Sequence, residues 1–315
     1  MSLQYKKKGE GHYLAEPNGA VDHGDATSTG SIAWCVDNIP SGGGVVELVP
    51  GIYNFNQQLS IRTDKIVIKG LTRAGTILSC DQTSNISVIL SSADQTQIHN
   101  VTMRGDPLGL SSEPMLYLKG TESTIDNVRI QNTSDSGIIV SGERNVINNI
   151  RITNTGGVSL KIDGDYTTLR NSYFSGSPNV TYLLHCTGDV IAIGSNHFNP
   201  SNASSIGIRV EGNHSSIRGN HFISEASDIT LLNLNTASYN LIAGNIFSGY
   251  GTPLGTGVII ETASSENMSI GNIYRLLADL ATVSSGCEYN AFVNDIDETT
   301  SGITDSGTGT WTKLL

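Results

Sequence analysis

The chain has 315 residues, a formal net charge of -11 and only 15% charged residues. Globular proteins usually carry about 25% charged residues, and here Gly, Ser, Thr and Asn take their place, as short strands and tight turns require. The negative charge disfavours nucleic acid and anionic membranes as partners, and no apolar run is long enough to span a bilayer.

The N-terminal segment, residues 1–43, is expected to contain one short helix. Its opening, MSLQYKKKGE, carries positive charge with no apolar run behind it, so no signal peptide is visible. In STGSIAWCVDNIP the apolar residues follow helical spacing from Ile32 to Ile39, and Ser28 or Thr29 can cap the start. A short amphipathic helix at this place predicts a cap over the apolar interior of the repeats that follow.

The chain then repeats a short apolar phrase around an asparagine, as in TIDNVRI and IRGNHF. The asparagines recur at spacings of 22 to 27 residues: Asn100, Asn127, Asn149, Asn171, Asn196, Asn220, Asn245, Asn272 and Asn294. Repeats of this length predict a solenoid, in which each unit buries its apolar face against its neighbours. Asparagine suits such a column because it tolerates a left-handed backbone and its amide can bond to the next turn. The asparagine follows Ile by two positions in TIDNVRI and by three in IRGNHF, so the corner is expected to shift between early and late turns.

Within each repeat, outward polar residues alternate with inward Ile, Leu, Val and Phe, which is the pattern of a strand with one buried face. Three such strands fit into one repeat, as in residues 124–142. The sequence therefore predicts an all-β protein, a right-handed parallel β-helix of about ten turns with a short N-terminal capping helix. Residues 44–286 would form the β-helix, and residues 287–315 the terminal turn and a C-terminal cap.

The segment GDATSTGSIAWCVDNIPSGGGVVELVPGIYNF resembles the opening of the pectate-lyase-like superfamily, in which a capping helix precedes a glycine run and a VPxGxY-type first turn. This chain has VPGIY at residues 49–53. The resemblance implies the β-helix fold and, because homotrimeric members occur, a homotrimer as one assembly. The superfamily includes lyases, hydrolases, epimerases, phage tailspikes and adhesins, so the resemblance does not fix a reaction. The sequence lacks DD, GHG and RxK in its expected place, which argues against a standard pectin hydrolase.

Stacked turns place equivalent residues above one another at about 4.8 Å. Aligning the third strand of each repeat on its closing glycine gives two outward columns. The first reads Tyr117, Ile139, Lys161, His185, Arg209, Asn233 and Ile259. The second, two residues further along each strand, reads Lys119, Ser141, Asp163, Thr187, Glu211, Asn235 and Glu261.

Lys161, His185 and Arg209 are the candidate catalytic residues of a polysaccharide lyase. Such an enzyme needs a base near the C5 proton of a uronate and a cation for the developing enolate. Lys161 or His185 could be the base, and Arg209 could bind the carboxylate bidentately. Asp163 and Glu211 make hydrolysis the second candidate, because their backbones should lie about 9.6 Å apart and inverting glycosidases separate their carboxyl groups by roughly 6.5–9.5 Å. The same four charges could equally form solvated ion pairs, Lys161 with Asp163 and Arg209 with Glu211.

Further substrate contacts are expected from Tyr117 and Asn233 in the outward column and from Tyr182 and Tyr250 in variable loops. These loops, SGSPNVTY, NPSNASSI and SGYGTPLGT, could form the wall of a groove. The middle strands give a more basic column that suits an acidic glycan or a neighbouring protein chain: Arg129, Arg151, Tyr173, His197 and His221. A metal pair of His197 and His221 lacks a third ligand.

The preferred function is cleavage of an acidic polysaccharide, by a lyase first and by a hydrolase second. The alternative is a non-catalytic structural protein, which is either a virion protein of the tailspike type or a surface protein that binds glycans. Either protein would be extracellular or virion-associated. No metal site or cofactor is expected; Ca²⁺ is compatible with the sequence but not indicated by it. The widely spaced cysteines are expected to be buried free thiols: Cys35, Cys80, Cys186 and Cys287.

Overall fold

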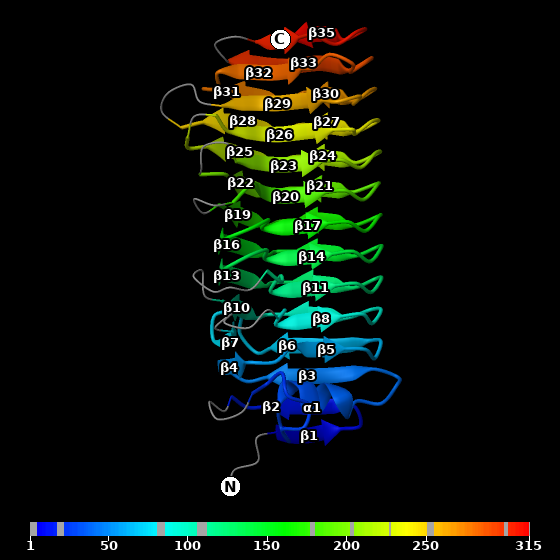
Figure 1. The fold of residues 1–315 in the computed structure, drawn as a ribbon, viewed down its shortest axis with the longest axis vertical. Helices are drawn as coiled ribbons and strands as arrows, with labels where there is room; N and C mark the ends of the chain where they lie inside the picture. The colour runs from blue at the N-terminus through cyan, green and yellow to red at the C-terminus, as the bar shows by residue number, and fades with distance from the viewer. Residues whose placement is uncertain are drawn as a thin grey trace. The chain divides into compact units, whose positions relative to one another are not determined.

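The computed structural model describes residues 5–17, 22–80, 86–105, 112–176, 180–201, 205–226, 228–250, 255–298 and 302–314. They fall into two compact units, residues 1–157 and residues 158–315. In each unit short strands form three parallel sheets, and each strand pairs with its equivalent one turn further along the chain (Figure 1). The units contain about ten turns of a parallel β-solenoid with almost no helix, which confirms the predicted fold class.

The first unit begins with β1 (Tyr5–Gly9), which pairs antiparallel with β2 (His12–Ala15). Its first sheet then continues through β3 (Gly44–Leu48), β6 (Ile66–Gly70), β9 (Gln97–His99), β12 (Thr124–Asp126) and β15 (Val146–Asn148). The second sheet contains β4 (Gly51–Phe55), β7 (Thr76–Cys80), β10 (Thr102–Arg104), β13 (Arg129–Thr133) and β16 (Arg151–Thr155). The third contains β5 (Leu59–Ile61), β8 (Ile89–Ser91), β11 (Leu116–Leu118) and β14 (Ile138–Val140).

The second unit repeats this arrangement. Its first sheet contains β18 (Thr168–Arg170), β21 (Ala192–Gly194), β24 (Ser216–Arg218), β27 (Leu241–Ala243), β30 (Met268–Ile270), β33 (Ala291–Glu298) and β35 (Trp311–Leu314). The second contains β19 (Tyr173–Ser175), β22 (His197–Asn199), β25 (His221–Ser224), β28 (Ile246–Gly249) and β31 (Ile273–Arg275), which pairs with the end of β33. The third contains β17 (Leu160–Ile162), β20 (Tyr182–Cys186), β23 (Ile206–Val210), β26 (Thr230–Asn235), β29 (Thr256–Glu261), β32 (Asp279–Val283) and β34 (Ile303–Asp305).

The predicted short helix is present as α1 (Ile32–Asp37), whose buried residues pack against β2, β3 and β5. The predicted cap was wrong, because Ser31 rather than Ser28 or Thr29 precedes the helix and accepts a hydrogen bond from the Trp34 N–H at 2.9 Å. The Ser28 hydroxyl instead donates to the carboxylate of Asp25 at 2.7 Å. Ser28 and Thr29 come three and two residues before this cap position, so neither is adjacent to the first helical N–H groups.

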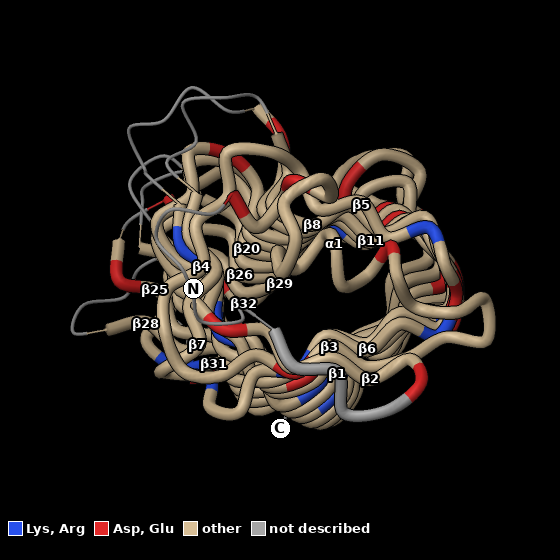
Figure 2. Tube along the Cα trace, turned by 90° about the horizontal axis from the view of Figure 1, so that it is seen from below, with Lys and Arg blue, Asp and Glu red and all other residues tan. Residues whose placement is uncertain are grey.

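The buried residues of each unit are mainly apolar, and among the described residues Asp295 is the only lysine, arginine, aspartate or glutamate that is buried. Figure 2 marks the positions of these four residue types along the Cα trace. In the second unit the second sheet contributes a continuous stack of buried rings, one from each turn. Neighbouring centroids lie 4.6–5.1 Å apart with nearly parallel planes, as the spacing of the turns requires: Phe174, Phe198, Phe222, Phe247 and Tyr274. This stack fixes the register of the strands on which it lies.

The asparagine column is confirmed for the early turns. Asn100, Asn127, Asn149 and Asn171 all have a left-handed backbone, with φ between 51° and 55°. In the first unit their amides bond from turn to turn, since Asn127 Nδ2 donates to Asn100 Oδ1 at 2.7 Å and Asn149 Nδ2 donates to Asn127 Oδ1 at 3.2 Å. Asparagine is one of the few residues that occupies this conformation at low cost.

In the four turns from Asn196 to Asn272 the asparagines occupy a different position, so the prediction of one left-handed column was wrong there, whereas Asn294 again has a left-handed backbone with φ of 54°. Ser195, Gly219, Gly244 and Gly271 take the left-handed corner. The following residues are asparagines with at most 3% exposure: Asn196, Asn220, Asn245 and Asn272. Each donates its side-chain amide to the Oδ1 of the residue one turn on, at 2.9–3.2 Å, and the series ends at the buried Asp295. The different position of the asparagine in TIDNVRI and IRGNHF therefore corresponds to a move of the side-chain amide from the corner into the interior.

All four cysteines are buried and free, as predicted. Burial raises the pKa of the Cys35 thiol to about 12, and it also raises the pKa of the Cys186 thiol. Among the described residues, no helix is long and apolar enough to cross a membrane.

Candidate functional site

The predicted outward column of the third sheet is present in the second unit. Lys161 on β17 pairs with His185 on β20, His185 pairs with Arg209 on β23, and Arg209 pairs with Asn233 on β26. Inward neighbours on these strands, such as Leu184, are completely buried and hold the strands on the apolar interior. The three cationic or titratable side chains therefore lie on consecutive strands, about 4.8 Å apart at the backbone.

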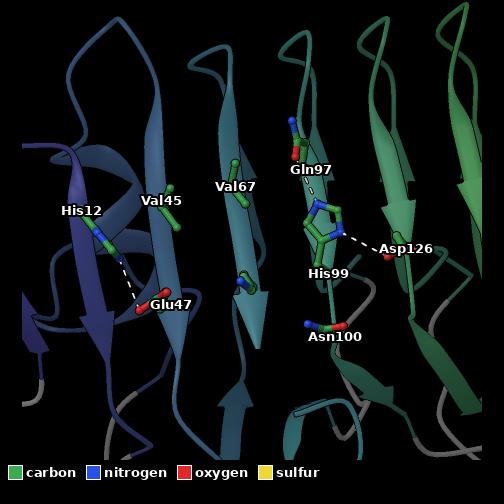
Figure 3. A pocket seen from close by; sticks show the side chains of 9 residues that line it. His12, Val45, Glu47, Val67, Gln97, His99, Asn100 and Asp126 are labelled. Carbon is green, nitrogen blue, oxygen red and sulfur yellow. Dashed lines mark hydrogen bonds and ion pairs between the residues drawn. The ribbon is translucent and has the colours of Figure 1, made fainter. Parts of the chain in front are cut away.

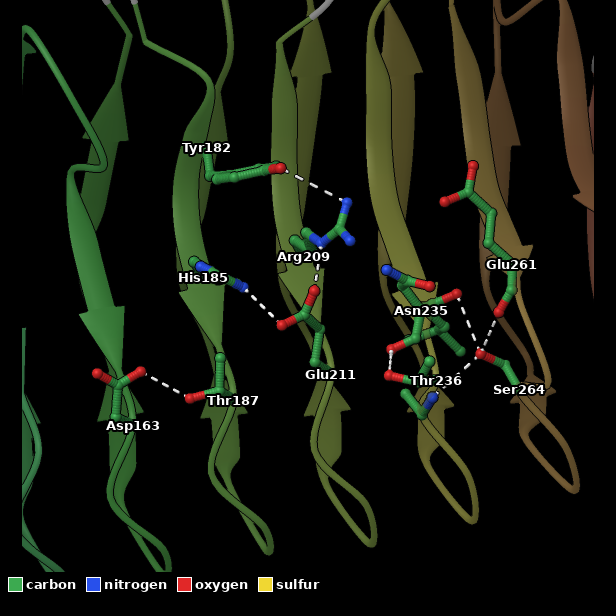
Figure 4. A network of polar contacts seen from close by, with 12 residues as sticks. Asp163, Tyr182, His185, Thr187, Arg209, Glu211, Asn235, Thr236, Glu261 and Ser264 are labelled. Carbon is green, nitrogen blue, oxygen red and sulfur yellow. Dashed lines mark hydrogen bonds and ion pairs between the residues drawn. The ribbon is translucent and has the colours of Figure 1, made fainter.

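Glu211 holds two of these side chains together (Figure 4). Its Oε1 accepts a hydrogen bond from Arg209 Nε at 2.8 Å, and its Oε2 lies 3.2 Å from His185 Nε2. Partial burial pushes the pKa of Glu211 upward, but the hydrogen bonds and charges of Arg209 and His185 outweigh it and leave this pKa below its usual value. Glu211 is therefore an ionised bridge between a guanidinium and an imidazole.

Tyr182 completes this cluster from the start of β20. Its hydroxyl accepts a hydrogen bond from Arg209 Nη1 at 3.5 Å, and the guanidinium lies 5.6 Å from the centre of the ring. The same ring lies 5.1 Å from the imidazole of His185. The sequence predicted Tyr182 as a substrate contact in a variable loop, whereas the structure places it at the start of β20, beside His185 and Arg209.

Asp163 belongs to a separate group at the β17 end of this face. Its Oδ2 forms an ion pair with Lys161 Nζ at 3.0 Å, and its Oδ1 accepts a hydrogen bond from Thr187 Oγ1 at 2.6 Å. The two carboxylates considered for hydrolysis, Asp163 and Glu211, are thus engaged by different partners. Both ion pairs that the alternative interpretation requires are formed.

The remaining predicted residues are more scattered. Asn233 has the predicted register, but its side chain is only 2% exposed and its Oδ1 has no hydrogen-bond partner. Tyr250 follows β28 and is 75% exposed. Tyr117 lies in the other unit, on β11 opposite Ile139, with Lys119 Nζ 4.6 Å from its ring centre. The three variable loops lie partly outside the described residues, at 177–179, 202–204 and 251–254.

The basic column of the second sheet is also in register within each unit. Arg129 pairs with Arg151 in the first unit, and Tyr173, His197 and His221 follow one another in the second. Burial lowers the pKa of His197, with a further contribution from His221, and burial lowers the pKa of His221. Both imidazoles are therefore neutral at neutral pH, which weakens this column as a site for anions.

One group of titratable residues was not assigned to any site from the sequence. Glu47, Lys69, His99 and Asp126 occupy consecutive turns on the outer face of the first sheet, in the first unit. The available signal was that His99 and Asp126 both immediately precede an asparagine of the column. That signal is weak, because the spacing from Glu47 to Asp126 is uneven.

Three solved structures resemble the fold closely. The A-module of the mannuronan C-5 epimerase AlgE6 from Azotobacter vinelandii is 13% identical, with a TM-score of 0.58, over 90% of this chain and 94% of that one. A tailspike protein of E. coli bacteriophage HK620, in complex with a pentasaccharide, is 13% identical with a TM-score of 0.70, over 95% and 62%. The alginate lyase AlyGC of family PL6 is 11% identical with a TM-score of 0.61, over 96% and 53%. The chain thus spans less than two thirds of the tailspike and of the lyase.

These likenesses and the three-sheet architecture show the fold, a right-handed parallel β-helix. No curated protein matches the sequence. The family described as "NosD: Periplasmic copper-binding protein (NosD)" matches residues 58–253, and the chain belongs to this family.

The described residues do not fit the copper ion in that family description. They contain no group of three or more His, Cys, Asp or Glu side chains that could hold a metal ion. His197 and His221 lie with ring centres 5.1 Å apart, but this pair has no third ligand beside it in the described part of the chain. The cysteines are buried, and burial raises the pKa of Cys186, which opposes the thiolate form that binds metals.

Proposed function

We propose that the protein engages an acidic polysaccharide on the outer face of β17, β20 and β23 and cleaves it by β-elimination. The register carries this proposal, because it brings Lys161, His185 and Arg209 onto consecutive strands of one rigid sheet. A chain with 18 basic residues and a net charge of -11 has few cations to place together. A local group of cations is what an anionic polymer needs in order to approach such a protein.

In this mechanism His185 is the base that removes the C5 proton of a uronate. The carboxylate of Glu211 contacts Nε2 of His185 and so fixes the orientation of the imidazole ring. The other ring nitrogen, Nδ1, is then the one that accepts the proton. Arg209 binds the uronate carboxylate with the nitrogens that do not bond to Glu211, and its charge stabilises the enolate that forms. Collapse of the enolate forms the C4–C5 double bond and breaks the C4–O4 bond, and the leaving O4 takes a proton from solvent. Lys161 is the second candidate for the base, and Asp163 limits it because the two form an ion pair.

The structural neighbours support a polysaccharide as the ligand class, since they include an alginate lyase, a mannuronan epimerase and a tailspike with a bound pentasaccharide. By the same likeness we place the protein outside the cell or on a virion, and a homotrimer is the assembly that we propose to test first. Hydrolysis by Asp163 and Glu211 is the second reaction, and it is less favoured because each carboxylate already binds cationic partners.

The competing function is a glycan-binding protein without catalysis, of the tailspike or surface type. One observation favours it. Lys161, His185 and Arg209 each contact a carboxylate, and exposed pairs of this kind are often no more than solvated surface charges. A binding face would need these same residues but no free base.

The test is incubation of the protein with a panel of uronic-acid polysaccharides, followed by the ultraviolet absorbance of unsaturated products. We expect product from at least one polymer, loss of turnover in His185→Ala, and unchanged turnover in His197→Ala, a matched histidine on another sheet of the same unit. Retention of activity in His185→Ala would place the base elsewhere. Binding of a polymer by affinity electrophoresis, without unsaturated ends or new reducing ends, would establish the binding protein instead.

A further inference from the structure

A pocket of about 510 Å³ lies on the outer face of the first sheet in the first unit (Figure 3). Two rows of side chains line it. The upper row is formed by His12, Val45, Val67 and Gln97, each paired in register with the next. The lower row is formed by Glu47, Lys69, His99 and Asp126, on β3, β6, β9 and β12. The pocket therefore has an apolar middle in its upper row and polar groups at both ends.

Each end of the pocket is held by a histidine and its neighbours. At one end His12 Nε2 lies 3.4 Å from Glu47 Oε2. At the other, His99 Nε2 lies 3.1 Å from Gln97 Oε1, and His99 Nδ1 lies 3.8 Å from Asp126 Oδ2. Burial lowers the pKa of His99, and Lys69 adds to this effect while Asp126 opposes it, so the imidazole is neutral at neutral pH. The ends thus present carboxylate oxygens and neutral polar groups.

Lys69 is the exception in this lower row. It lies between Glu47 and His99 in register, its side chain is exposed, and it forms no hydrogen bond or ion pair with another described residue. The other charged members of the row are engaged: Glu47 contacts His12, and Asp126 accepts a hydrogen bond from Asn148 Nδ2 at 2.6 Å. One unpaired ammonium group in the middle of a pocket calls for one anionic group on the ligand.

We propose that this pocket binds a sugar acid, whose carboxylate pairs with Lys69 and whose hydroxyl groups donate to Glu47 and Asp126. The valines at positions 45 and 67 would contact the apolar C–H face of the ring. A dianion such as phosphate is disfavoured because the pocket is lined by two carboxylates and only one lysine. A metal ion is disfavoured because no group of three ligands that could hold one exists among the described residues.

This inference goes beyond the proposed function, since the pocket belongs to another sheet and to the other unit and does not depend on any cleavage. The probes are galacturonate and glucuronate, with glucose as the uncharged comparison, titrated into the full chain and followed by NMR. We expect both acids to bind more tightly than glucose. Lys69→Gln should weaken binding of the acids by about tenfold or more, the worth of a charge-assisted hydrogen bond.

Two variants decide where the acids bind. Lys119→Gln removes another lysine from the first unit, outside the pocket, and should leave the dissociation constants within about twofold of the wild type. Arg209→Gln removes the carboxylate ligand of the face proposed for the polymer, so it eliminates binding of the acids at that face and should leave the binding that depends on Lys69. The pocket proposal is overturned if neither acid binds, if glucose binds equally well, or if Arg209→Gln abolishes binding and Lys69→Gln does not. Absence of polymer cleavage would refute the proposed lyase and leave this result intact.

Discussion

Replacing Asn220 by alanine removes one link of the interior amide series of the second unit. Asn220 is 1% exposed. Its Oδ1 accepts hydrogen bonds from the backbone N–H of Asn196 at 2.9 Å and from Asn196 Nδ2 at 3.0 Å. Its own Nδ2 donates to the carbonyl of Ile193 and to Asn245 Oδ1, both at 3.0 Å. Alanine can replace none of these four contacts.

The cost of Asn220→Ala follows from the groups that lose a partner. The backbone N–H of Asn196 and one of its two amide protons are left without an acceptor, while its other amide proton still bonds to the carbonyl of Leu169. A buried donor without a partner costs about 1–3 kcal/mol, so two of them should lower the free energy of unfolding by about 2–6 kcal/mol. That loss is a large part of the stability of a typical domain.

Urea unfolding followed by far-ultraviolet circular dichroism measures this loss, with Asn149→Gly as the matched control. Asn149 is exposed and lies at the left-handed corner with φ of 51°, and its side-chain amide donates a hydrogen bond to Asn127 Oδ1 at 3.2 Å. Glycine accepts this backbone, so the control should lose less than about 1 kcal/mol. If both variants unfold at the same urea concentration, with equal slopes, the interior series does not hold the turns together.

Two further substitutions test buried charge and backbone strain. Asp295 ends the amide series, and burial raises the pKa of its carboxyl group, so ionisation of Asp295 destabilises the fold. The stability that the protonated Asp295 contributes is fully present below the pKa of the unfolded state and is lost as pH rises through the pKa of the folded state. Asp295→Asn should therefore raise the melting temperature at neutral pH and flatten its dependence on pH; a lower melting temperature at pH 7 would contradict this. Val190 has φ of 58° and is 39% exposed, and a β-branched residue is strained there. Val190→Asn should stabilise the protein by about 1 kcal/mol in urea unfolding, and an unchanged midpoint would show that the corner stores no strain.

The outward column of the third sheet could be predicted from the sequence because its repeat is regular. Lys161, His185, Arg209 and Asn233 are each 24 residues from the next, so no insertion disturbs the alignment. The contacts between columns could not be predicted in the same way. Whether Glu211 bonds to its neighbour on the same strand or to His185 on the preceding strand depends on side-chain rotamers, and the structure shows both contacts.

The pocket of the first sheet was missed for the opposite reason. The steps from Glu47 to Lys69, from Lys69 to His99 and from His99 to Asp126 are 22, 30 and 27 residues, because loops of different length interrupt the early turns. Only the strand pairing shows that these side chains lie on successive turns. The prediction of a left-handed asparagine column failed between Asn196 and Asn272 because a serine or a glycine takes the left-handed corner in these turns, and the asparagine then lies at the next, buried position.

The separation between the interior and the outer face decides how functional substitutions are to be interpreted. In the second unit the amide series and the ring stack lie in the interior. His185 and Arg209 are partly exposed, and both contact the carboxylate of Glu211. A substitution of His185 should therefore change chemistry with little effect on stability, since exposed ion pairs contribute about 0–1 kcal/mol. Asn233 differs, because it is buried and its Oδ1 has no hydrogen-bond partner. Replacing Asn233 therefore changes the free energy of unfolding, by removing the cost of burying an unpaired oxygen, and it changes the shape of the face as well. Loss of activity in an Asn233 variant would thus not identify a substrate contact, whereas loss in His185→Ala, with an unchanged urea midpoint, would.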